Sequence, residues 1–196
     1  MIAFTLAVFF LIITPGPGVL SLAGVGAAFG PRHGTQYLVG LFVGNNVVAI
    51  TVASGLAAVI FGYPPVRVLF YAVSLCYLAY LAARIAFAGS RVAFIERAAP
   101  PGVKGGILLQ VVNPKAYAVT TALFSGFAFM PFQPVIELAL KLLLFNAVWV
   151  PLHALWLWLG ITLQRLDLSP ARQRTINIAM AASMIAVVVI AAMAPR

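Results

Sequence analysis

Two proline-containing motifs, each inside a long apolar segment, carry the residues of this chain that are best suited to bind a small anion. The motif TPGPG occupies residues 14–18, and the motif Asn113-Pro114-Lys115 lies in a later apolar segment. Threonine and asparagine are common helix N-caps, and proline is favoured at the first helical position. Each motif therefore predicts that a helix begins inside the apolar segment and presents unpaired N–H groups at a positive dipole end.

The position of Lys115 strengthens this interpretation. It lies ten residues after Gly105, or about 15 Å at the rise of a helix, close to the middle of a bilayer. A charge there costs about 2.5–3.5 kcal/mol on insertion scales, and backbone groups freed by a break need partners in the protein or in a water-filled cavity. We expect the two breaks to form one anion site, most simply for a carboxylate. The alternative is that both are packing kinks.

Polar side chains elsewhere in the apolar segments are further candidates. Asn45, Asn46 and Asn146 either bond across helices or line a path and bind the ammonium group or side chain of a ligand. Gln110, one turn before the second motif, has the same two roles open to it. His153 is the candidate for proton coupling, and a hydrogen-bonded histidine between helices is the alternative. The candidate ligand residues are Thr14, Pro15, Gly16, Pro17, Gly18, Asn45, Asn46, Asn113, Pro114, Lys115 and Asn146.

The composition defines the class of the protein. Of its 196 residues, 64% are hydrophobic and 8% are charged, and the mean hydropathy is +1.10. Soluble chains carry roughly 25% charged residues, so we expect an integral membrane protein. The net charge of +9 fits the positive-inside rule, because the basic residues lie between apolar segments. They do not form the single stripe that nucleic acid would need, so no nucleic-acid partner is expected.

The chain has few of the residue types that an enzyme or a redox protein needs. It has two histidines and one cysteine, Cys76, and Glu137 lies only at the edge of an apolar segment. Catalysis would need a nucleophile with its base or a set of metal ligands, and thiol exchange needs a pair of cysteines. We therefore expect no enzyme activity, metal or cofactor. Glu137 and Lys141 have the i,i+4 spacing of a helical ion pair.

Six segments are long and apolar enough to cross a bilayer as helices, so we predict an all-α fold with one polytopic domain over residues 1–196. The predicted spans are about 1–26, 37–61, 66–88, 106–128, 136–163 and 173–194. The connections on one side hold eight basic residues and those on the other side three, which puts both termini outside. If the fourth segment is only re-entrant, five spans remain and the C-terminus lies inside.

The unusual residues of the two halves have matching spacing. Pro15 and Pro114 are 99 residues apart, and Asn46 and Asn146 are 100 apart, against a half-length of 98. Three spans per half would insert the second half upside down relative to the first. This spacing suggests a 3+3 inverted repeat whose first and fourth helices are broken.

Four stretches together resemble the LysE/RhtB family of amino-acid exporters. They are TPGP in the first span, GLFVGNNVV opening the second, YLAYLAARIA closing the third and NPKA in the fourth. The resemblance runs from Phe10 to about Ile190. It implies a secondary transporter of the bacterial inner membrane that exports amino acids or close derivatives, driven by the proton motive force.

Charge narrows the expected substrate. The side chain of a basic amino acid would need a buried acid, which is not evident, and Lys115 would repel it. We therefore expect small neutral amino acids such as threonine, homoserine or leucine. The alternative is a channel or permease for another small carboxylate or ion. The expected partners are the substrate and membrane lipid, and the sequence leaves open whether the chain forms a homo-oligomer.

Overall fold

The computed structural model describes residues 1–14, 16–57, 62–86, 99–165 and 169–193, and the long elements within these ranges are helices. They are α1 (Ile2–Ile13), α2 (Pro17–Ala53), α4 (Pro64–Ala86), α5 (Gly102–Val112), α6 (Pro114–Gly126), α7 (Pro134–Arg165) and α8 (Pro170–Met193). The prediction of an all-α chain is confirmed. The predicted apolar spans fall on these helices, whereas the count of six spans and the inverted repeat stay predictions.

Helix α2 folds back on itself at Gly30. That residue has φ 79° and ψ −175°, a conformation that favours glycine, and Pro31 follows without the N–H that a continuous helix needs. The Tyr37 hydroxyl consequently reaches the Ser21 hydroxyl, with 3.1 Å between the two oxygens. Residues 17–29 and 31–53 thus form two packed arms, which we call the first and second arms of α2.

The second motif interrupts the helix as predicted. Helix α5 ends at Val112, and Asn113 has an extended backbone with φ −81° and ψ 107°. Asn113 is the N-cap of α6, and Pro114 occupies the first helical position. An N–H at that position would have no acceptor within the helix, so its absence in proline costs nothing.

The first motif begins its new helix two residues later than predicted. Helix α2 starts at Pro17, and its N-cap is Gly16, whose backbone is extended. Thr14 instead ends α1, and its hydroxyl donates to the Phe10 carbonyl at 2.9 Å, one turn back. A hydroxyl bonded to the preceding turn does not cap the following helix, so the prediction of Thr14 as N-cap is wrong. Pro15 lies outside the described residues.

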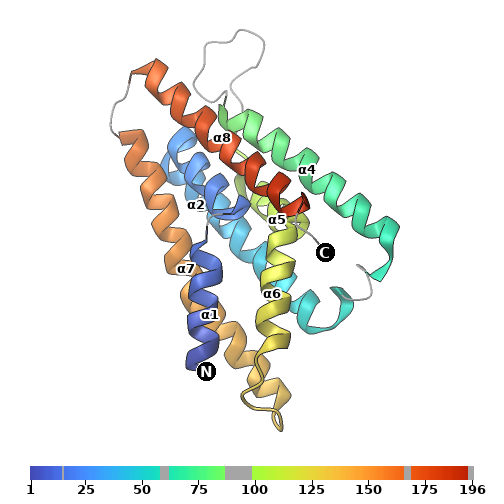
Figure 1. The fold of residues 1–196 in the computed structure, drawn as a ribbon. Helices are drawn as coiled ribbons and strands as arrows, with labels where there is room; N and C mark the ends of the chain where they lie inside the picture. Colours follow the sequence, from blue (N-terminus) through green and yellow to red (C-terminus); the bar gives the residue numbers. More distant parts are fainter. Residues whose placement is uncertain (15, 58–61, 87–98, 166–168, 194–196) are drawn as a thin grey trace.

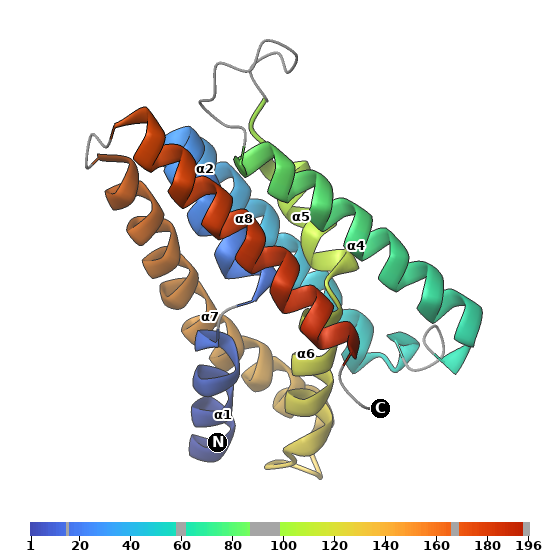
Figure 2. The same cartoon turned by 45° about the horizontal axis from the view of Figure 1, so that its top comes forward.

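The helices pack so that the two breaks come close together. Helix α1 contacts α6 and α7 at the end that holds the N-terminus, and α2 packs most extensively against α5 and α7 (Figure 1). Helix α8 runs alongside α4 and also contacts α2 (Figure 2). Each short helix therefore packs against at least one longer helix that positions it, α1 against α7 and both α5 and α6 against α2.

Glycines allow the second arm of α2 to approach α5 at backbone distance. A Cβ on Gly40 would overlap the Val103 carbonyl, and a Cβ on Gly44 would lie 2.9 Å from the Ile107 carbonyl. Small residues spaced four apart permit this kind of close helix contact in membranes. The contact brings Asn45, the residue after Gly44, against the last turn of α5.

The outer surface is strongly apolar. Phe10, Val68 and Leu143 are each about two-thirds exposed, at 65%, 67% and 65% of their area. Within the described ranges, the helices Pro17–Ala53 and Pro134–Leu163 have the length and hydropathy needed to cross a membrane. Many exposed large hydrophobic side chains, spread over several helices, suit contact with lipid.

Candidate functional site

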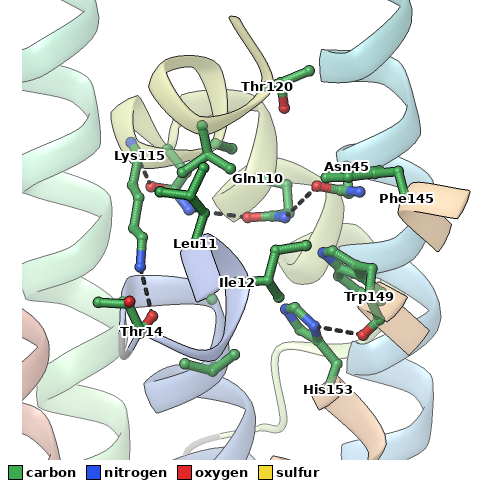
Figure 3. A pocket seen from close by; sticks show the side chains of 16 residues that line it. Leu11, Ile12, Thr14, Asn45, Gln110, Lys115, Thr120, Phe145, Trp149 and His153 are labelled. Carbon is green, nitrogen blue, oxygen red and sulfur yellow. Dashed lines mark hydrogen bonds between the residues drawn. The ribbon is translucent and has the colours of Figure 1, made fainter. Parts of the chain in front are cut away.

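A cavity of about 60 Å³ lies where the two helix breaks meet (Figure 3). It is lined from the first break by Thr14, Gly16 and Gly18, and from the second break by Asn113 and Lys115. Asn45 from the second arm of α2, Gln110 from α5 and His153 from α7 complete the set of predicted residues that it collects. The volume is enough for a few water molecules or a small polar ligand.

The N-terminus of α2 is open toward this cavity. Its N-cap, Gly16, brings no side-chain cap, and its first residue is Pro17, which has no N–H. The next two N–H groups, on Gly18 and Val19, belong to the first turn and so have no acceptor within the helix. Both residues are buried and line the cavity. Two backbone donors at a positive helix end are a ready anion site.

The N-terminus of α6 is closed by its own cap. The Lys115 N–H donates to the Asn113 side-chain oxygen at 3.1 Å, and the Ala116 N–H donates to the Asn113 carbonyl at 3.0 Å. The two breaks were predicted to offer equivalent N-termini. In the structure, the first N-terminus is open to the cavity, whereas the N–H groups of the second are bonded by its own N-cap residue.

The Lys115 side chain links the second break to the first. Its Nζ donates to the Thr14 carbonyl at 2.6 Å, across 101 residues of sequence (Figure 3). That carbonyl belongs to the C-terminal end of α1, where a cation is stabilised by the helix dipole. A Cβ on Gly16 would lie 2.8 Å from Lys115 Cδ and 3.0 Å from Nζ, so the absence of a side chain at Gly16 makes room for the contact.

A directed chain of side-chain amides crosses the cavity wall. The Asn113 amide nitrogen donates to the Gln110 side-chain oxygen at 3.0 Å, and the Gln110 nitrogen donates to the Asn45 oxygen at 3.3 Å (Figure 3). All three side chains are buried. The hydrogen bonds therefore fix which end of each amide is the oxygen, and the chain runs from the second break to the second arm of α2.

His153 faces the cavity with one ring nitrogen. Its Nδ1 lies 2.9 Å from the Trp149 carbonyl, which can only accept, so Nδ1 carries hydrogen and Nε2 of a neutral ring is an acceptor. A Cβ on Gly18 would lie 3.8 Å from that Nε2. The ring is stacked on Trp149 with 3.5 Å between centroids. Both interpretations of His153 are thus compatible, because one nitrogen bonds to its helix and the other is turned toward the ligand space.

Asn46 and Asn146 lie outside the cavity lining. Each donates to the other, at 3.1 Å from Asn46 and 2.8 Å from Asn146, and each also donates one turn back, to the Phe42 and Leu142 carbonyls. This geometry corresponds to the alternative in which these amides bond across helices, here between α2 and α7. Pro17 and Pro114 likewise set helix starts and are not lining residues.

Several lining residues were not singled out from the sequence. They include Thr120 and Phe145. Trp149, one of the aromatic residues of a type that anchors membrane interfaces, also lines the cavity and is only 2% exposed. A signal for Thr120 was present, because Asn113, Ala116 and Thr120 have the three- and four-residue spacing of one helix face. Phe145 has no such signal in an apolar run.

The Glu137–Lys141 ion pair forms as its spacing predicted, with 2.7 Å between Oε1 and Nζ. Glu137 also accepts from the N–H groups of Phe129, at 3.0 Å, and Met130. Lys141 donates to the Phe124 carbonyl at 2.9 Å. The pair fastens the connection after α6 onto α7 and is not part of the cavity. Within the described ranges, no three His, Cys, Asp or Glu side chains gather as a metal site would need.

Two helix breaks that meet at a small cavity with several polar lining groups, in a chain with an apolar outer surface, are typical of a membrane transporter. The sequence model of the LysE type translocator family matches residues 9–194, and the chain belongs to this family. No curated protein and no solved structure matches the chain. Family and fold together make it a multi-pass membrane transporter and confirm the resemblance carried by its motifs.

Proposed function

We propose that this chain is a secondary transporter that exports small neutral amino acids across the bacterial inner membrane, driven by the proton motive force. The observation that carries the proposal is the open N-terminus of α2 in the central cavity, beside the Lys115 ammonium group. Backbone donors at a helix end and a nearby cation are the chemistry that a substrate carboxylate requires.

The same cavity offers acceptors for the substrate's ammonium group. The carboxylate would accept from the Gly18 and Val19 N–H groups, with Lys115 supplying the countercharge. Gln110 Oε1 and His153 Nε2 both lie near Gly18, at 3.5 Å and 3.8 Å from where its Cβ would stand. Because an α-amino acid carries its ammonium and carboxylate groups on the same carbon atom, donors and acceptors grouped around one glycine suit it.

The proposed substrate class follows from the lining. Asp and Glu do not occur among the cavity-lining residues that the structure describes, and Lys115 is cationic. A basic side chain would therefore meet repulsion without a counterion. The small volume likewise favours small neutral amino acids.

His153 offers a way to couple export to protons. A proton added at Nε2 would turn this acceptor into a cationic donor, which would repel the substrate's ammonium group. Proton entry from outside would then follow substrate release. The two halves of the chain, each with a broken first helix, would move around the cavity to alternate access. His153→Asn retains a donor for the Trp149 carbonyl and should export at a rate that no longer depends on the proton gradient.

Efflux from dipeptide-loaded cells tests the proposal. Cells that express the chain and cells with empty vector would be loaded with dipeptides of the common amino acids, with and without an uncoupler. We expect efflux of small neutral amino acids that collapses with the uncoupler. Efflux that is unchanged by the uncoupler would favour a channel or permease. Efflux limited to other small carboxylates would overturn the assignment of amino acids as substrates.

A further inference from the structure

Two buried polar atoms at the cavity lack a hydrogen-bond partner within the described part of the chain. They are the amide nitrogen of Asn45 and the hydroxyl oxygen of Thr120. Asn45 is 3% exposed and Thr120 is not exposed at all, yet both line the cavity. Buried polar groups almost always have partners in native proteins, so two unpartnered ones at one ligand cavity point to a group that the ligand supplies.

The amide chain determines what that group must be. The Asn45 oxygen is already occupied, because it accepts from the Gln110 nitrogen at 3.3 Å, and Gln110 is held in this orientation by Asn113. Asn45 therefore presents a nitrogen donor and no acceptor to the remaining space. A hydroxyl such as that of Thr120 both donates and accepts. The matching ligand atom is an oxygen.

These two atoms lie away from the Lys115 ammonium group, the proposed countercharge of the substrate carboxylate. In Figure 3, Asn45 and Thr120 are both well separated from Thr14 and the Lys115 ammonium group that contacts it. Gln110 spans the gap, since its oxygen lies near Gly18 and its nitrogen bonds to Asn45. A substrate with its α-carbon near Gly18 would direct its side chain toward Asn45 and Thr120.

We propose that Asn45 Nδ2 and Thr120 Oγ1 form a second subsite, which binds a side-chain oxygen of the exported amino acid. The transporter then prefers a small amino acid with a side-chain hydroxyl or carbonyl to an aliphatic one of equal size. This inference rests on the proposed function. The physical reason is that an aliphatic side chain would leave two buried polar atoms without partners, and sites that hydrogen-bond a substrate strongly reject the analogue that lacks the group.

Threonine and valine provide the test, because they have nearly the same shape and differ by a hydroxyl in place of a methyl group. Cells expressing the full chain would be loaded with equal amounts of alanyl-threonine and alanyl-valine, and the ratio of initial efflux rates measured. We expect threonine to leave faster than valine by about 10-fold or more. A ratio measured within one cell population does not depend on how much transporter is present.

Two substitutions at Thr120 separate hydrogen bonding from packing. Thr120→Val preserves shape and removes the hydroxyl, so the ratio of threonine efflux to valine efflux should fall toward one. Thr120→Ser keeps the hydroxyl and should keep the preference. Thr121→Val is the matched control, because Thr121 is the exposed neighbour on the same helix and should leave the ratio unchanged.

The outcomes distinguish the subsite from the proposed function. Equal efflux of threonine and valine from the wild-type chain would overturn the subsite and leave the exporter in place, as would efflux restricted to amino acids without a side-chain oxygen. A preference for threonine that survives Thr120→Val would also overturn it. Absence of efflux for every amino acid would overturn the exporter and the subsite together.

Discussion

The two helix breaks are built from similar residues but end in different states. At the first, between α1 and α2, the N-cap is Gly16, which has no side chain to bond the first turn of the new helix. At the second, between α5 and α6, Asn113 caps the new helix with both its side chain and its carbonyl. Proline places the helix start in both cases, whereas the residue before the proline decides whether the N-terminus remains available to a ligand.

The difference assigns the two breaks different tasks. The open N-terminus at the first break is the part that would hold a carboxylate. The closed break supplies fixed groups instead, because its cap Asn113 orients Gln110 and its second helical residue, Lys115, reaches the Thr14 carbonyl. In the proposed mechanism, the first break would bind the ligand, and the second would hold the groups around the cavity in place.

We expect the largest effect on transport from removing the Lys115 ammonium group, which links the two breaks. Lys115→Met removes both the cation beside the carboxylate site and the donor to the Thr14 carbonyl. Hydrogen bonds to charged groups contribute about 1.5–3 kcal/mol, so we expect efflux to fall by about 10- to 150-fold. Uncoupler-sensitive efflux at equal membrane abundance measures this. Unchanged transport in this variant would overturn the carboxylate site.

A substitution that makes the first break resemble the second should have the next largest effect. Gly16→Ser adds a side-chain oxygen able to cap the first turn of α2, where it would compete with the substrate. Gly16→Ala is the matched control, since it adds the same Cβ, at 2.8 Å from Lys115 Cδ, without the oxygen. We expect a several-fold weaker apparent affinity for Ser than for Ala, read from the concentration dependence of efflux. Equal behaviour would mean that this N-terminus does not bind the ligand.

Removing the helix cap at the second break should mainly lower the stability of the fold. Asn113→Ala removes the cap of α6, which is worth about 1 kcal/mol, and also releases Gln110 from its fixed orientation. We expect a lower melting temperature in detergent, whereas Asn113→Asp, which keeps a capping oxygen but has no amide donor for Gln110, should recover only part of the loss. A melting temperature unchanged by the alanine would show that the cap contributes nothing.

The smallest effect is expected at Asn46 and Asn146, which occupy similar positions in the two halves and bond to each other. Side-chain hydrogen bonds between membrane helices are worth about 0.6 kcal/mol on average. A double-mutant cycle with alanine at both positions should therefore give a coupling of that size, and the threonine-to-valine efflux ratio should not move. A change in that ratio would place the pair in the substrate path instead.

Sequence reasoning located the breaks because their causes are local. Proline lacks an N–H wherever it stands, and Asn113 caps a helix that begins at the next residue. The same reasoning chose Thr14 over Gly16 as the first cap, because two prolines compete in TPGPG and only the contact to Phe10 shows which way the hydroxyl turns. It also missed Thr120 and Phe145, whose importance depends on what faces them.

The sequence by itself determined the class of the protein, its apolar segments and the two places where a helix must stop and restart, since composition and backbone chemistry do not depend on distant residues. Only the tertiary structure decided that Lys115 reaches Thr14 across 101 residues and that Gln110 reaches Asn45 across 65. These contacts arise from the close packing of α5 on the second arm of α2 and from the missing side chain at Gly16. The pairing of donors and acceptors around a cavity is a property of that packing, which determines which polar atoms are satisfied and which are left for a ligand.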